Sequence, residues 1–157
     1  MSPLPRLAFL AALAAFATSP ADARVLVTFQ DTGSYSDPDL HGLSVRAELK
    51  AHLQRLGARY LPRDADLKIT VLDVRLAGQF AWWRTPPSLR VMNESTWPTV
   101  TLRYTLSRGA RTIDAREETI ADQFYLNRSR TLSAGPLVYE KALLDDWFRE
   151  RFANRPN

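Results

Sequence analysis

Hydrophobic and polar residues alternate in three segments of the chain, and this spacing is typical of β-strands. In residues 25–29 every second position is apolar. In residues 99–106 apolar residues alternate with threonine and arginine, which predicts a strand with one dry and one wet face. A weaker pattern over residues 112–121 predicts another strand, joined to the preceding one by a short hairpin loop that contains Gly109.

A fourth strand-like segment, Leu67 to Leu76, changes phase in its middle. Every second residue from 67 to 71 is apolar, and so is every second residue from 72 to 76, on the opposite face. A β-bulge between Val71 and Leu72 would return both sets to the core face, because one inserted residue restores the phase. The alternative is a strand that is covered on both faces.

Apolar residues at helical intervals predict a helix from about Leu40 to Leu56. Asp37 or Asp39 is the expected N-cap, and Gly57 is the expected left-handed stop just past the end of the helix. His52 lies on the apolar stripe of this helix, where we expect a half-buried side chain that is hydrogen-bonded to a neighbour rather than a functional histidine.

A second helix is predicted to start at Gly135-Pro136, since proline in the first turn loses no hydrogen bond. Asp145 and Arg149 would form an i,i+4 ion pair on its polar side. Its apolar stripe comprises Leu137, Leu144, Phe148 and Phe152, widened by Tyr139, Leu143 and Trp147.

The element order is therefore strand, helix, three strands and helix. Elements with one apolar face each assemble most simply as an α+β two-layer sandwich. We predict a four-stranded, mainly antiparallel sheet with two helices on one face.

The N-terminus has the features of an export signal: a cation at Arg6, an apolar run, and Ala21-Asp22-Ala23 as a cleavage site. We expect residues 1–23 to be removed and residues 24–157 to form a single periplasmic or secreted domain. The apolar run is too short for a membrane-spanning helix, which needs about 20 residues. The chain has no cysteine, so neither a disulfide nor a lipid anchor on cysteine is expected.

The net charge is +4, and Lys50, Lys68 and Lys141 are the only lysines among the 21 basic residues. Arginine pairs with anionic groups in a bidentate way, but the charge is dispersed along the chain. We therefore expect a solvated surface first, an anion-binding surface as the alternative, and no nucleic-acid partner.

The long connection between the second and third strands, residues 77–98, holds three of the four tryptophans. We call it the aromatic connection. A plain hairpin needs only two to five residues, so this segment either packs down as structure or presents a surface. Tryptophan and arginine together can stack on sugars, contact anionic headgroups or clasp a protein. The residues expected to contact a ligand or partner are Trp82, Trp83, Arg84, Arg90 and Trp97.

No catalytic or metal-binding residue and no cofactor is predicted. Asp31-Thr32-Gly33 matches the loop of aspartic proteases, but a tripeptide is weak evidence and a turn explains it. The same loop gathers Asp31, Asp37, Asp39 and His41. This group lacks a calcium-loop pattern, zinc would need three or four ligands in near-tetrahedral geometry, and helix capping by Asp37 or Asp39 is the simpler use. Adjacent carboxylates cannot act as a dyad, because neighbouring side chains diverge on a helix or a strand. The two such pairs are Glu117-Glu118 and Asp145-Asp146.

The chain resembles the bacterial exported family catalogued as domain of unknown function 3016. The segments that carry the resemblance span most of the region after the signal: residues 56–62, 67–78, 90–98, 102–106, 117–122 and 139–148. The resemblance implies an exported single domain, with no activity attached.

These observations favour a non-catalytic periplasmic accessory or binding domain. Its aromatic connection would contact an envelope protein, a glycan or an anionic lipid. The alternative hypothesis is a hydrolase-like enzyme that uses Asp and Glu side chains near the same connection, such as Asp73 and Glu94. Convergence of these carboxylates with His52 in one cleft would favour catalysis.

Overall fold

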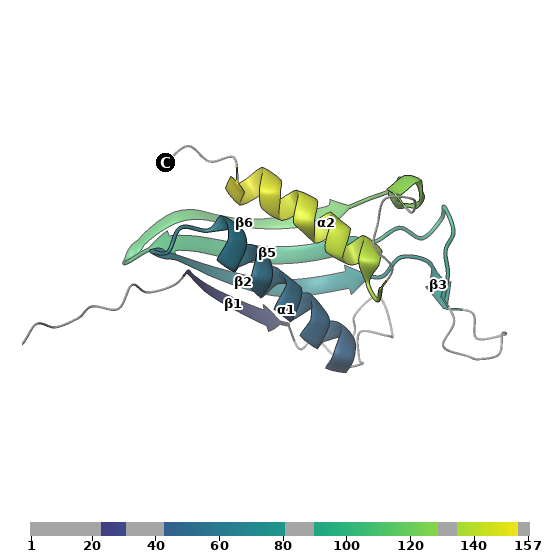
Figure 1. Ribbon diagram of the computed structural model, residues 1–157, viewed down its shortest axis with the longest axis horizontal. Helices are drawn as coiled ribbons and strands as arrows, with labels where there is room; N and C mark the ends of the chain where they lie inside the picture. Colours follow the sequence, from purple (N-terminus) through teal and green to yellow (C-terminus); the bar gives the residue numbers. More distant parts are fainter. Residues whose placement is uncertain (1–22, 31–42, 81–89, 129–134, 154–157) are drawn as a thin grey trace, which may run out of the picture.

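The computed structural model describes residues 23–30, 43–80, 90–128 and 135–153 (Figure 1). Four strands form one sheet in the order β1-β2-β5-β6. Two helices cover the same face of this sheet (Figure 1), so the predicted α+β two-layer arrangement is confirmed. The main elements are β1 (Arg24–Phe29), α1 (Leu43–Tyr60), β2 (Ala65–Arg75), β5 (Thr99–Arg108), β6 (Arg111–Ala121) and α2 (Val138–Phe148).

The sheet is mixed. β1 runs parallel to β2, and α1 provides the crossover that a parallel pair requires. β2, β5 and β6 form an antiparallel meander, as predicted. The apolar faces of the strands and helices meet in one core, in which Leu67, Leu102 and Phe148 have no exposed surface.

The phase change in β2 is a β-bulge. Val71 pairs with Leu102, whereas the next paired residue is Asp73, opposite Thr101. Leu72 is the inserted residue and is only partly buried, while Val74 returns to the core. The predicted bulge is confirmed, although Leu72 itself is only partly buried and is not a core residue.

Gly57 does not end the first helix, contrary to the prediction. α1 continues to Tyr60, and a Cβ atom at position 57 would lie 2.0 Å from Cγ2 of Val25. Glycine is therefore needed here because α1 packs closely on β1, not because the chain turns. The expected start at Leu40 and the caps Asp37 and Asp39 lie outside the described residues.

The second helix starts later than predicted. Leu137 has a φ of 56°, which a residue inside a helix cannot adopt, so Pro136 belongs to the preceding turn and α2 begins at Val138. After Phe148 the chain continues as a π-helical turn, η3 (Arg149–Ala153), which keeps Phe152 buried.

The predicted ion pair between Asp145 and Arg149 is wrong in its acidic partner. Arg149 pairs with the carboxylate of Asp146, three residues away, and Nε of Arg149 donates to the backbone oxygen of Asp145. The carboxylate of Asp145 instead meets His52 of α1 at 2.9 Å. Asp145 therefore ties the two helices together. None of the helices in the described part of the chain is long and apolar enough to cross a membrane.

Candidate functional site

The aromatic connection leaves the sheet through a short hairpin stem. Two-residue strands, β3 (Gln79–Phe80) and β4 (Arg90–Val91), pair in an antiparallel way at its base. Strands this short have no periodicity, so the sequence pattern did not predict them. Trp82, Trp83 and Arg84 lie between them, outside the described residues.

Gly78 allows this stem to form. Its φ is +74°, and a Cβ atom there would lie 2.7 Å from the backbone oxygen of Val91. Only glycine tolerates both the left-handed backbone and the close approach. The N–H of Gly78 donates to the oxygen of Thr96 at 2.9 Å, which joins the two ends of the connection.

Arg90 clamps the stem to the end of β2. Its Nε donates to the oxygen of Ala77 at 3.1 Å, and its Nη2 donates to the oxygens of Gly78 at 2.9 Å and Leu76 at 3.4 Å. These bonds give Arg90 a structural use that the sequence did not reveal. Its predicted contact with a ligand stays a prediction.

Glu140 holds the same turn from the helix side. It lies in the first turn of α2, is 3% exposed, and its Oε1 accepts a hydrogen bond of 2.6 Å from the N–H of Ala77. The sequence pattern did not predict this contact of Glu140. The available signal was its position four residues before Leu144, which places it on the apolar stripe of the helix.

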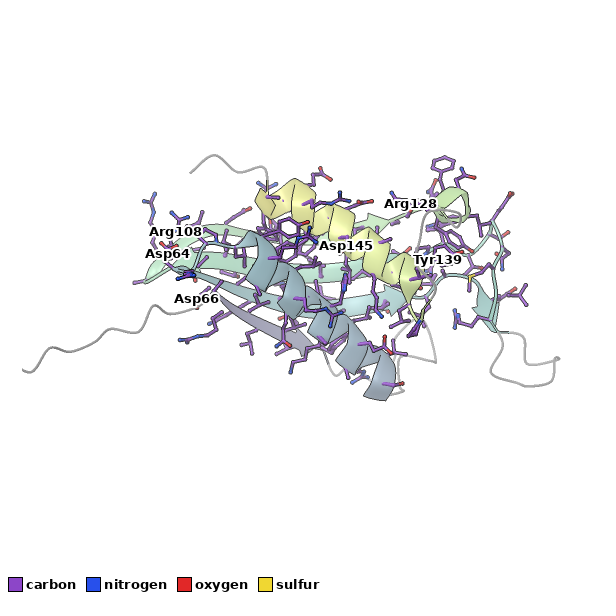
Figure 2. The ribbon with its side chains drawn as sticks, viewed as in Figure 1. Asp64, Asp66, Arg108, Arg128, Tyr139 and Asp145 are labelled. Carbon is purple, nitrogen blue, oxygen red and sulfur yellow. The ribbon has the colours of Figure 1, made fainter. Side chains whose placement is uncertain are left out.

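Tyr125 fixes the returning arm of the connection. It begins the 3₁₀ turn η2 (Tyr125–Arg128), and its hydroxyl donates to the oxygen of Asn93 at 2.8 Å while accepting from the N–H of Asn93 at 3.1 Å. Its ring packs edge-on against Tyr139 of α2, which lies at this end of the molecule (Figure 2). Burial raises the pKa of Tyr125, and the nearby Tyr139 and Glu140 add to this effect.

Trp97 is partly buried just before β5. The backbone on either side of it is fixed, because the oxygen of Thr96 binds Gly78 and the oxygen of Pro98 accepts from the N–H of Asp122 at 3.2 Å. Two other large apolar side chains of this end are exposed: Met92, next to Asn93, and Phe124, next to Tyr125. Phe124 is 73% exposed. A fixed framework thus carries exposed apolar side chains.

Three of the side chains weighed for catalysis, His52, Glu117 and Glu118, are each used in a structural contact. His52 is 13% exposed and its Nε2 meets Asp145, which confirms the expected hydrogen-bonded histidine, with α2 supplying the partner. Nδ1 of His52 faces Arg55 at 3.4 Å, so Nδ1 is the acceptor and Nε2 the donor when the ring is neutral.

The Glu117-Glu118 pair diverges, as the geometry of a strand requires. Glu117 bonds Arg103 on the outer face of the sheet at 2.7 Å, whereas Glu118 faces the helices. Glu118 accepts from Nε1 of Trp147 at 2.9 Å and from Arg151 at 3.1 Å. Within the described ranges, no three His, Asp or Glu side chains gather as they would around a metal ion. Asp31, Asp37, Asp39 and His41 lie outside those ranges.

Comparison with known proteins identifies the family. Residues 23–150 match the family described as Protein of unknown function (DUF3016). The chain belongs to this family. No curated protein matches it in sequence. Among solved structures, it is similar to the dodecamer of a PelC point variant from Paraburkholderia phytofirmans, at 14% identity and a TM-score of 0.40, over 87% of this chain and 93% of that one.

Proposed function

We propose that this DUF3016 protein is an exported, non-catalytic binding domain whose aromatic connection contacts a component of the cell envelope. The observation that carries the proposal is the anchoring of the connection. Arg90, Glu140 and Tyr125 fix its two arms to the sheet and to α2. A segment built this rigidly at its base can present side chains to a partner at a low entropic cost.

The composition of the segment agrees with this role. Trp82, Trp83 and Arg84 are carried between the two arms, and Trp97 follows on the return. Met92 and Phe124 add exposed apolar surface at the same end. Tryptophan and arginine are the residues most enriched at the centres of interfaces, so a protein, a glycan or an anionic lipid of the envelope is the expected partner.

The hydrolase alternative draws no support from the described residues. His52 bonds Asp145, whereas Glu118 bonds Trp147 and Arg151. Catalysis by acid and base groups requires their convergence on one substrate position.

A binding assay tests the proposal. Envelope membranes, envelope glycan and envelope protein extract are each offered to the native protein and to a Trp82→Ala, Trp83→Ala double variant. We expect the double variant to lose at least about tenfold in affinity for one fraction, since truncating an interface tryptophan costs about 2 kcal/mol. The matched control is Leu26→Ala, which removes an exposed apolar side chain from β1.

Equal binding by the double variant and the native protein, at equal thermal stability, would refute the proposal. Export is tested separately by determining the N-terminus of the protein recovered from the periplasm. Cleavage after Ala23 gives Arg24 as the first residue, whereas an intact N-terminus at Met1 would exclude this cleavage.

A further inference from the structure

A pocket of about 580 Å³ lies at the end of the molecule away from the aromatic connection. It is enclosed by the C-terminal end of α1, the start of β2, the β5–β6 hairpin and the end of η3. Its volume lies within the range of about 300–1,000 Å³ that is typical of small-molecule sites. Its lining is part apolar and part polar, and the apolar side chains include Tyr60, Leu61, Ala65, Leu106, Ile113 and Phe152.

The walls of this pocket are held by the core. Leu106 and Phe152 are buried, and the ring of Phe152 packs edge-on against Tyr104 at 5.4 Å between ring centroids. The ring of Tyr60 packs against Phe148 at 6.0 Å. Ile113, in contrast, lines the pocket while remaining 44% exposed. The pocket is therefore largely pre-formed, with an apolar side chain left open to water at its edge.

Two arginines at the hairpin give the pocket a positive charge. Arg108 and Arg111 are directly opposite each other in the register of β5 and β6, and both line the pocket. Asp64 pairs with Arg108 at 3.2 Å, and the two lie together at this end of the molecule (Figure 2). Within the described part of the chain, Arg111 has no ion-pair partner.

Like charges directly opposite each other on neighbouring strands destabilise a sheet. One carboxylate beside two guanidinium groups leaves an excess positive charge in the lining of the pocket, next to its apolar side chains. A bound anion would relieve this repulsion, and arginine binds a carboxylate with two parallel hydrogen bonds.

We propose that this pocket binds a single-chain amphiphile with a carboxylate head, of the fatty-acid class. The alkyl chain occupies the apolar walls formed by Leu106, Ile113 and Phe152. The carboxylate pairs with Arg111, next to Arg108. This site is separate from the aromatic connection and does not depend on the function proposed for it.

The chemistry of the pocket argues against other occupants. A cationic amphiphile would face the two arginines, and a sugar would leave the apolar side chains of Leu106, Ile113 and Phe152 without an apolar partner. A free fatty acid satisfies both the apolar and the charged part of the site.

Isothermal titration calorimetry with monomeric dodecanoate tests the proposal, with dodecyltrimethylammonium and acetate as comparators. We expect dodecanoate to bind at least about tenfold more tightly than either comparator, because only dodecanoate has both the chain and the anionic head. The proposal would be overturned if dodecyltrimethylammonium bound as tightly as dodecanoate. It would also be overturned if the protein bound vesicles of anionic phospholipid but not monomeric dodecanoate.

Two variants locate the site. Arg111→Gln should weaken dodecanoate binding by about tenfold, as expected for one lost charge-assisted hydrogen bond, yet raise the thermal stability of the ligand-free protein by removing the like-charge pair. A merely structural arginine would not produce these opposite changes. The matched control is Arg75→Gln, an exposed arginine at the other end of β2, which should leave binding unchanged.

Ala153→Trp should abolish binding by filling the pocket from the exposed end of η3. Circular dichroism checks that Ala153→Trp folds. If Ala153→Trp does not fold, the dodecanoate affinity of Arg111→Gln tests the proposal. Wild-type affinity in Arg111→Gln would overturn the proposal.

Discussion

The carboxylate of Glu140 accepts a hydrogen bond of 2.6 Å from the backbone N–H of Ala77, at the point where β2 leads into the aromatic connection. Glu140 is the buried charged side chain of the described core. Burying a carboxylate costs free energy unless the carboxylate is well hydrogen-bonded. The position of Glu140 on the apolar stripe of α2 therefore needs an explanation. The reason is the turn at Leu76 to Gly78, whose N–H groups bind Glu140 and Thr96 and whose oxygens bind Arg90.

Glu140→Ala should destabilise the protein by about 2–3 kcal/mol, because it leaves the buried N–H of Ala77 without an acceptor. Glu140→Gln keeps an acceptor at the same place and should cost about 1 kcal/mol. Urea unfolding followed by tryptophan fluorescence measures both values. Glu150→Ala, which removes an exposed carboxylate from η3, serves as the control. A loss in Glu140→Ala no larger than in this control would contradict the prediction.

Arg90→Lys should destabilise the stem of the aromatic connection by about 1–2 kcal/mol. Lysine keeps the charge but cannot reach the three carbonyl oxygens at once, because it lacks the planar fork of arginine. The free energy of unfolding and hydrogen exchange at Val91 measure the loss. Arg75→Lys, at an exposed position of β2, controls for the exchange of one cation for another. If Arg90→Lys has the same free energy of unfolding as the wild type, the hydrogen bonds of Arg90 to the three carbonyl oxygens do not stabilise the fold.

Side-chain periodicity was sufficient to predict the sheet, the helices and the bulge at Leu72. Alternation reports which face of a strand is buried, and a phase change has few physical causes. The same information placed His52 on the inner face of α1. It could not identify Asp145 as the partner, since that contact joins residues 93 positions apart in the chain.

The contacts of the candidate site lay beyond the sequence for a related reason. Arg90 and Glu140 act on backbone groups, and backbone groups carry no sequence signal. The Arg108 and Arg111 pair depends on the hairpin register, which shifts between Leu106 and Ser107. The prediction that Gly57 ends the first helix is wrong because the sequence does not distinguish a glycine needed for close packing from a glycine needed for a left-handed turn.

Gly57→Ala should therefore destabilise the protein by about 2 kcal/mol, as is typical of overpacking, even though alanine favours a helix by about 1 kcal/mol. The cause is the 2.0 Å approach of the new Cβ atom to Val25. Thermal unfolding measures the loss. A Val25→Ala, Gly57→Ala double variant removes the clash and should be more stable than the sum of the two single changes predicts. Strict additivity of the two changes would show that Val25 is not the obstacle.

Stability should also fall in alkaline solution as Tyr104 ionises. The pKa of Tyr104 is raised from 10.0 to about 12, and burial is the largest cause. The hydrogen bond of 2.8 Å to Asp114 and the charges of Asp114 and Glu118 also raise this pKa, whereas Arg116 lowers it. Because the folded pKa lies above the unfolded value, the contribution is complete below pH 10 and is lost as the pH rises through about 12. A shift of this size corresponds to roughly 2–3 kcal/mol.

Urea unfolding between pH 9 and pH 12 tests this linkage in the wild type and in Tyr104→Phe. Tyr104→Phe cannot ionise at this position, so its free energy of unfolding should decline less steeply with pH than that of the wild type. The two slopes should differ by up to about 1.4 kcal/mol per pH unit between the unfolded and folded pKa values of Tyr104. The difference between the two curves isolates Tyr104 from Tyr125, whose pKa burial also raises. Parallel curves would mean that Tyr104 ionises equally easily in the folded and unfolded chains, and that its bond to Asp114 does not protect the proton.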